Sequence, residues 1–171
     1  MTYLRMAKEE LLRRYTEGER DFSKVNLYQE MNGVDLRGAI FRDSELSCDM
    51  RGADLAGCNL SDAEIGGQVA GINLRDADLR GATMAELDLR GACLINADMS
   101  NVNLSQSILD GALLLNVNFS NAYLGEVSFQ GADLTNANLK DAIEFSEYLA
   151  ILRNTIMPDG SIVPNRQWRA L

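Results

Sequence analysis

The amino-acid sequence predicts an all-β solenoid, a chain wound into stacked coils, and three observations support this fold class. A large apolar residue recurs at every fifth position without a break from Leu74 to Leu139. A second row of small residues, mostly alanine, lies two positions earlier, as at Ala77 and Ala82. The residues between the two rows are mostly polar, as in "GADLT" and "NANLK". We therefore expect each five-residue unit to point one large and one small side chain inward.

A period of five excludes both common secondary structures. Around an α-helix each repeat would turn the large residue by about 140°, so the row would scatter over the whole circumference. In a flat strand successive large residues would point to opposite faces. Only a chain that turns after every unit keeps the whole row inside. The small residue then fits where the corner narrows, and the glycines of "RGA" and "QGA" ease the bend.

The A(D/N)LXX pattern resembles the pentapeptide-repeat family over about residues 20–142. This resemblance implies a right-handed quadrilateral parallel β-helix, with four repeats in each coil. The opening "EELLRRYTEGERDFSKVNL" and the closing "TIMPDGSI" are similar to the end segments of cyanobacterial members.

The first coils are expected to be one residue short at one corner. Three gaps in the large apolar row are nine residues long instead of ten, and they recur every nineteen residues: Leu27 to Leu36, Leu46 to Leu55, and Ile65 to Leu74. One wall should therefore carry an irregular row near Met31, Met50 and Val69. This row is either a tolerated backbone irregularity or a shaped groove or bulge used for contact.

We divide the chain into an N-terminal helical cap (1–19), a β-helix (20–142) and a C-terminal cap and tail (143–171). The ends of a stack need covering, because open edges invite edge-to-edge growth. The pattern predicts a short α-helix over 4–17 that ends at Gly18 and has one apolar face: Leu4, Leu11, Leu12 and Tyr15. At the other end "SEYLAILRN" predicts a short helix that begins at Ser146, and "MPDG" predicts a turn. The tail through Trp168 either folds back or stays mobile.

Charge and cysteine content bound the environment and the partners. Residues 20–144 carry nineteen acids against nine bases, so direct nucleic-acid binding is not expected. No run approaches the roughly 18 apolar residues of a membrane span, and no secretory signal is present, so we expect a cytoplasmic protein without membrane contact. The three cysteines, Cys48, Cys58 and Cys93, are an odd number without a CxxC motif, which indicates reduced structural thiols.

The sequence predicts no active site. Without histidine, the Ser-His and Cys-His arrangements that activate nucleophiles are excluded. Eight aspartates share one outward slot of the repeat, so a positional rule explains them better than a catalytic pair does: Asp21, Asp35, Asp49, Asp54, Asp78, Asp88, Asp98 and Asp133. We expect no enzyme activity, no metal, no cofactor and no small-molecule substrate.

If the family fold holds, residues twenty apart lie side by side on one wall. On the wall through Leu94 and Leu114, four apolar residues then face solvent on adjacent rungs: Cys93, Ile95, Leu113 and Leu115. A contiguous exposed apolar cluster often marks a contact surface, so these four are the candidate protein-binding residues. The alternatives are that a terminal segment covers them or that they are unused. The next wall should instead carry a solvated, hydrogen-bonded ladder: Asp78, Asp98, Asn118 and Asn138.

The sequence thus favours a non-enzymatic protein-binding, scaffold or regulatory module, with an unidentified protein partner or a homo-oligomer. The resemblance implies a regulatory role as one option, because some pentapeptide-repeat proteins act in cyanobacterial differentiation. It also implies an alternative, a DNA-mimic inhibitor or modulator of a type II topoisomerase (gyrase), as in the gyrase-binding branch of the family. An acidic rod is consistent with mimicry of a phosphate array.

Overall fold

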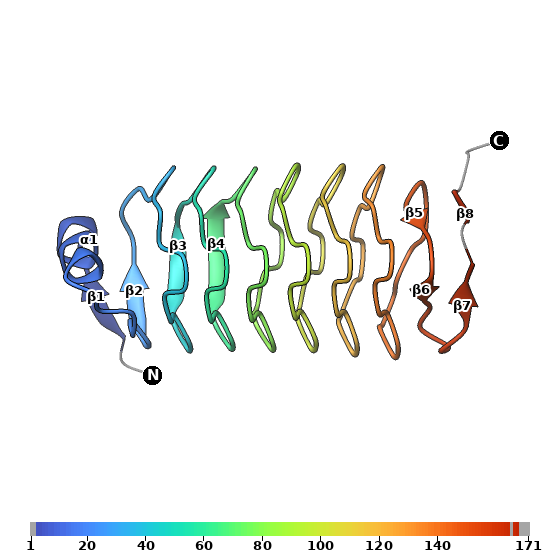
Figure 1. Cartoon of the computed structure of the whole chain (residues 1–171), viewed down its shortest axis with the longest axis horizontal. Helices are drawn as coiled ribbons and strands as arrows, with labels where there is room; N and C mark the ends of the chain where they lie inside the picture. The colour runs from blue at the N-terminus through green and yellow to red at the C-terminus, as the bar shows by residue number, and fades with distance from the viewer. Residues whose placement is uncertain (1–2, 165, 168–171) are drawn as a thin grey trace.

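The computed structural model describes residues 3–164 and 166–167, and it shows an elongated rod of stacked coils (Figure 1). Up to Ile143, each coil consists of four five-residue units or is one residue shorter, since parallel backbone bridges join residues nineteen or twenty apart. Examples are Ile40↔Asn59 in the first half and Asp98↔Asn118 in the second. Residues far apart in sequence therefore stack directly on one another, as the period of five predicts.

Only a few rungs are long enough to form regular strands. β1 (Leu4–Met6), β2 (Val25–Leu27), β3 (Glu45–Asp49) and β4 (Glu64–Gln68) make a parallel sheet in that order, and α1 (Lys8–Thr16) follows β1. At the other end β5 (Ile151–Leu152) pairs antiparallel with β8 (Arg166–Gln167), and β6 (Thr155–Ile156) pairs antiparallel with β7 (Ile162–Val163).

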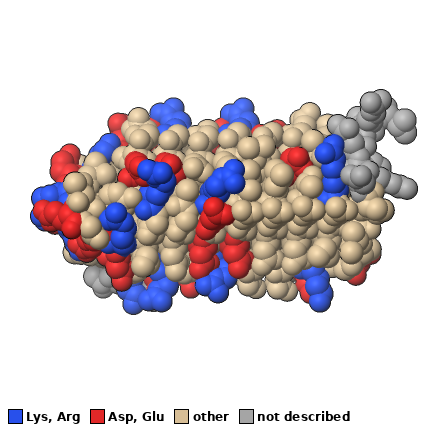
Figure 2. All heavy atoms as spheres, in the orientation of Figure 1, with Lys and Arg blue, Asp and Glu red and all other residues tan. Residues whose placement is uncertain are grey.

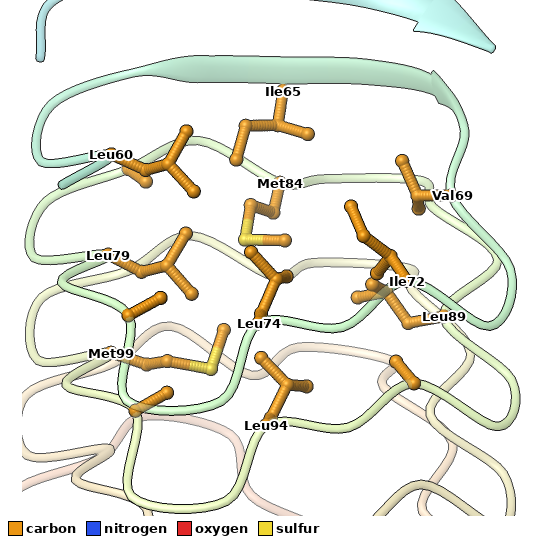
Figure 3. Close-up of a cluster of buried hydrophobic side chains, with 14 of the residues drawn as sticks. Leu60, Ile65, Val69, Ile72, Leu74, Leu79, Met84, Leu89, Leu94 and Met99 are labelled. Carbon is orange, nitrogen blue, oxygen red and sulfur yellow. The ribbon is translucent and has the colours of Figure 1, made fainter. Parts of the chain in front are cut away.

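The interior of the rod is a single apolar column built from the two predicted rows. Every large residue of the row from Leu74 to Leu139 is at most 1% exposed. The eight alanines of the small row between Ala77 and Ala137 are at most 2% exposed. Figure 3 shows large side chains from successive coils, Leu79 and Met99 among them, pointing into this column. Both predicted rows therefore face inward.

The corners are tight turns closed by backbone hydrogen bonds. In the unit that begins at Leu74, the Ala77 N–H donates to the Leu74 carbonyl at 3.2 Å, and Asp76 between them has a φ of 57°. A hydrogen bond over three residues with a positive φ at the third position is the signature of a type II turn. Gly, Asn and Asp tolerate that conformation best, which explains why they are frequent two positions after the large residue.

The prediction that the first coils are one residue short at one corner is confirmed. Pairing advances by nineteen residues through Glu64↔Thr83 and by twenty from Asn73↔Cys93 to Tyr123↔Ile143, and the last two bridges, Asp133↔Ile151 and Asn138↔Ile156, span eighteen. At the short corner the chain runs straight on in β3 and β4 and makes no turn. A surface hollow of about 380 Å³ lies where the spacing changes, lined by Arg51, Gly67, Gln68, Val69, Ala70, Glu86 and Asp88. Whether this hollow serves a contact stays a prediction.

Gly67 is required at the short corner by a close backbone approach. It pairs with Cys48 of the preceding coil and has a φ of +79°. A Cβ atom at this position would lie 2.4 Å from the Cys48 carbonyl oxygen. Both the positive φ and the lack of space therefore exclude a side chain here.

At the N-terminal end the helix begins later than the sequence indicates. α1 starts at Lys8, with Leu11 buried and Leu12 and Tyr15 packed against the core. The expectation that Leu4 belongs to this helical face is wrong, because Leu4 lies in β1 and is 61% exposed. Pairing of β1 with β2 outweighs the helical pattern there. No helix of the described residues is long and apolar enough to cross a membrane.

At the C-terminal end the predicted turn at "MPDG" is confirmed, since the Gly160 N–H donates to the Met157 carbonyl at 2.9 Å, but the predicted helix from Ser146 is wrong. The chain turns at Tyr148 and at Leu149, whose φ of 57° does not occur in an α-helix, and then enters β5. The cause is tertiary: Ile151 donates its N–H to Ala132 and accepts a hydrogen bond from Leu134, which continues the ladder. Residues 168–171, with Trp168, lie outside the described part of the chain. The three-segment division stays a prediction.

A buried serine, Ser107, replaces alanine in one inward slot. Its hydroxyl satisfies the backbone groups of a turn that is not closed by its own hydrogen bond. The Ser107 hydroxyl donates to the Met84 carbonyl at 2.8 Å and accepts from the Leu87 N–H at 3.0 Å. These are the two groups that a type II turn would join directly. Leu87 is large for the small slot, and the hydroxyl of the next coil bridges the gap. Ser107 is 1% exposed, so no water could take over both bonds without rearrangement.

We predict that Gly67→Ala lowers the free energy of unfolding by more than about 2 kcal/mol, because it adds a backbone collision to the cost of a positive φ. Gly91→Ala is the matched control, since Gly91 has a φ of +67° with nothing within 4 Å of its Cβ position. It should lose only about 1 kcal/mol. Urea denaturation followed by circular dichroism measures both, and equal losses would contradict the collision.

We predict that Ser107→Ala destabilises the protein by about 1–3 kcal/mol, because it leaves a buried N–H and a buried carbonyl without partners. The control is Ser120→Ala, at an outward position on the wall through Phe119. It should change stability by less than about 0.5 kcal/mol. Thermal unfolding monitored at 218 nm, a wavelength of roughly maximal β signal, compares the two variants. A neutral Ser107→Ala would mean that the turn closes by itself.

Candidate functional site

The outward side chains form ladders that run along the rod. The Asn118 side-chain amide donates to Asp98 at 3.0 Å, and Asn138 donates to Asn118 at 3.1 Å. Asp98, Asn118 and Asn138 therefore form three rungs of the predicted hydrogen-bonded ladder, but Asp78 is not part of it, because its carboxylate is held by Arg80. A second ladder, which sequence reasoning missed, follows one corner through Asp76, Asn96, Asn116 and Asn136. The sequence pattern that could have revealed this ladder is an Asp or Asn two positions after each large residue of one wall: Leu74, Leu94, Leu114 and Leu134.

The aspartates of the outward slot are held by neighbours in their own repeat. In the sequence Asp78-Leu79-Arg80, both guanidinium contacts to the carboxylate are 2.8 Å or shorter, and the Arg80 N–H donates to the same carboxylate. The hydrogen bond from Arg80 holds the pKa of Asp78 below its ordinary value. The same arrangement occurs at Asp35–Arg37, Asp49–Arg51 and Asp88–Arg90. These acids therefore form ion pairs within their own repeats, and each carboxylate keeps its charge at neutral pH.

The described residues contain no group of three or more His, Cys, Asp or Glu side chains arranged to hold a metal ion. The cysteines are free, and two of them are buried in the interior. Burial raises the pKa of Cys48 to about 11 and that of Cys58 to about 12. The Cys58 thiol donates to the Leu36 carbonyl at 3.1 Å. These two thiols are protonated packing groups and weak nucleophiles.

The structure brings the four candidate binding residues together. Cys93 and Leu113 are bridge partners on adjacent rungs, and the backbone of Asn96, next to Ile95, bonds to Leu115. Leu113 is 45% exposed, and the other three are half-buried. We call Cys93, Ile95, Leu113 and Leu115 the apolar patch. No described segment covers Leu113, so the alternative that a terminus hides the patch is not seen in residues 3–164 and 166–167. That these residues bind protein stays a prediction.

Other exposed apolar side chains lie on the two remaining walls, and sequence reasoning missed them. Ile108 is 40% exposed, Tyr123 is 38% and Ile143 is 53%. All three occupy the outward slot that aspartate usually fills, so the slot rule itself could have identified them. Tyr123 and Ile143 are bridge partners, and the Tyr123 hydroxyl donates to Glu144 at 3.4 Å. The negative charge of Glu144 raises the pKa of Tyr123.

Charge is unevenly distributed along the rod. Between Met99 and Gly125 the only charged residue is Asp110, so more than one full coil is almost neutral. On the face in view in Figure 2, charged side chains are dense toward the N-terminal end and sparse over the later coils. Leu113 and Leu115 lie in this neutral region, where desolvation of charges would not oppose a contact.

Comparisons with known proteins agree with the geometry. A family model described as pentapeptide repeats matches eight copies over residues 21–67, 72–111 and 109–141. No curated protein matches the sequence.

Among solved structures, the chain resembles HetL, a pentapeptide repeat protein involved in heterocyst differentiation regulation from the cyanobacterium Nostoc sp. strain PCC 7120. The TM-score is 0.51 at 25% identity, over 92% of this chain and all of HetL. It also resembles full-length QnrB1, a plasmid-mediated fluoroquinolone resistance protein, with a TM-score of 0.65 at 18% identity. That match covers 86% of this chain and 79% of QnrB1, and it shows likeness of fold alone. The repeat match over most of the chain, with its stacked four-unit coils, makes this protein a member of the pentapeptide-repeat family with the right-handed β-helix of that family.

Proposed function

We propose that this protein is a non-enzymatic binding module, a rigid rod that regulates or scaffolds another protein through the apolar patch. The observation that carries the proposal is the contiguity of Cys93, Ile95, Leu113 and Leu115 on adjacent rungs of one wall, with Leu113 and Leu115 in the almost neutral stretch. Scattered exposed apolar residues are normal on soluble proteins, but four on adjacent rungs form a surface that gains free energy when a partner covers it.

The rod suits this role because its surface is ordered before a partner arrives. Each rung of the patch is fixed by backbone hydrogen bonds on both sides: Leu113 donates to Ala92, and Leu114 donates to Asp133. The large residues between the exposed ones are fully buried, so the wall cannot deform locally without disturbing the column. Binding to such a surface loses little conformational entropy. HetL, a family member of similar length, is described as involved in heterocyst differentiation regulation, which supports the regulatory form of the proposal.

We infer a cytoplasmic location from the cysteines. The chain has three free thiols, two of them buried and protonated, and such thiols are typical of proteins from a reducing compartment.

We predict that the double substitution Leu113→Ser and Leu115→Ser weakens partner binding at least about tenfold, because it removes two of the three large aliphatic groups of the patch. Affinity capture from the native cytosol with purified bait, quantified by mass spectrometry, measures the loss. The fold should persist, since both side chains face outward.

The matched control is the double variant Ile108→Ser and Tyr123→Ser, which removes exposed apolar groups from other walls. It should capture the same protein as the wild type does. A protein captured equally by all three baits would contradict the assignment of binding to the apolar patch, and equal loss in both variants would show that binding needs surface hydrophobicity in general.

The alternative role as a DNA mimic is favoured by the excess of ten acids over bases in residues 20–144. The Asp–Arg pairs act against it, because an array that imitates phosphates needs unneutralised charges. Four of the eight slot aspartates are neutralised by the arginine two residues later. We therefore place this role second.

We predict that the purified protein does not inhibit supercoiling by gyrase, even at a large molar excess, because four of the eight slot aspartates are neutralised by arginines of their own repeat. An agarose-gel supercoiling assay, with a known protein inhibitor as the positive control, gives the answer. Inhibition by the wild type that disappears when Asp21 and Asp98 are changed to Asn would establish mimicry and reverse the order of the two functions.

A further inference from the structure

We infer that the partner of the apolar patch is a second copy of this chain, bound in an antiparallel pair around a two-fold axis. The inference rests on the proposed function, since it takes the patch to be a protein-binding surface and identifies what binds there.

Two rows of outward side chains flank the buried leucines on the patch wall. The row before each leucine contains Asp54, Asn73, Cys93, Leu113 and Asp133, joined rung to rung by backbone bridges. The row after each leucine contains Ala56, Arg75, Ile95, Leu115, Thr135 and Arg153. The backbone carbonyl of each of these residues accepts a hydrogen bond from an N–H of the preceding coil, as Leu115 does from Asn96. The apolar patch is thus the centre of a longer polar strip.

The charges of this strip are antisymmetric about the patch. One rung toward the N-terminal end lies Arg75, and one rung toward the C-terminal end lies Asp133. One rung further out the signs are reversed, with Asp54 on the first side and Arg153 on the second. A strip with this pattern is complementary to itself when one copy is turned end for end.

A two-fold axis that runs along the strand direction, midway between the Cys93 and Leu113 rungs, produces that arrangement. It keeps each row opposite the same row and reverses the order of rungs, so Cys93 faces Leu113 of the other copy and Ile95 faces Leu115. Arg75 then lies diagonally across from Asp133 of the other copy, and Asp54 lies across from Arg153. Because the contact is isologous, each pair forms twice. A parallel arrangement would instead place Arg75 beside Arg75 on the same rung.

The arginines of the strip are available for such pairs. Arg37, Arg51, Arg80 and Arg90 each hold an aspartate two residues earlier in the chain. Arg75 follows Asn73 and has no such aspartate. Within residues 3–164 and 166–167, neither Arg75 nor Arg153 is in an ion pair, although both are exposed. Among the described residues, the Asp133 carboxylate accepts hydrogen bonds only from Thr135, whereas Asp54 already lies 3.6 Å from Arg37.

Net charge also selects this region for self-association. Two copies that each carry −9 repel one another over most of their surface. The two central rungs of the strip, Cys93 with Ile95 and Leu113 with Leu115, carry no charged residue, so two copies can meet there without placing like charges in contact. A basic partner protein would instead prefer the acidic coils nearer the N-terminal end. The apolar centre is small, so we expect a reversible pair with a Kd of roughly micromolar order.

Sedimentation velocity of the full chain under reducing conditions, over a range of concentrations, tests the inference. The wild type should shift reversibly from 18.8 kDa to twice that mass as concentration rises. Arg75→Asp and Asp133→Arg should each weaken the pair at least about tenfold, because each sets like charges against one another. The variant that carries both changes should recover the wild-type Kd. Arg80→Asp, on the neighbouring wall, should leave the Kd unchanged.

The outcomes separate this inference from the proposed function. The inference that the partner is a second copy is overturned if the wild type stays monomeric. It is also overturned if neither single charge reversal changes the Kd of the pair. In that case capture of a different protein that is lost with Leu113→Ser and Leu115→Ser would leave the binding function intact. The antiparallel register is overturned if both single variants associate weakly, the variant with both changes does not recover, and circular dichroism shows that all three keep the fold.

Discussion

The structure depends on one packing constraint: the interior of the coil has room for one large and one small side chain in every five residues. The large residues from successive coils meet along the axis of the rod, and the small ones lie where the chain turns. Protein interiors are close-packed, so neither position tolerates much change in volume. Where Leu87 occupies the small position, the turn opens and Ser107 from the next coil must satisfy its backbone groups.

This constraint on the interior leaves the outward positions free to vary, and that freedom determines what the surface can do. Because the backbone ladder stacks equivalent positions, any residue placed outward has its counterparts about 5 Å away on neighbouring coils. Amides then form hydrogen-bonded ladders, as along Asn96 and Asn116, and aspartates pair with arginines of their own repeat. Apolar residues in the same positions form a patch. The chemical character of each wall is therefore determined by the outward residues that recur every nineteen or twenty positions in the sequence.

Much of the architecture was predictable for the same reason. The two inward rows, the short corner and the neighbourhood of Cys93 and Leu113 all follow from counting residues, because pairing along the rod is fixed by the repeat length. The ends of the rod were less predictable. Leu4 and Ile151 occur in stretches with helical patterns, yet both pair with the adjacent coil, whose open edge offers hydrogen bonds that a short helix cannot match. Local patterns fail where an edge of the stack competes for the backbone.

The candidate site shows the same division between what the repeat determines and what it leaves open. Counting predicts which outward residues are neighbours, but it does not show which charged groups already have partners. Arg80 and Arg75 occupy equivalent positions after a leucine, and they differ only because Asp78 precedes one and Asn73 the other. Within the part of the chain that the structure describes, that single exchange leaves Arg75 without an ion pair beside an apolar cluster, while Arg80 is neutralised within its own repeat. In a protein whose interior repeats with so little variation, recognition must depend on such departures, because the regular positions are the same on every coil and cannot distinguish one part of the rod from another.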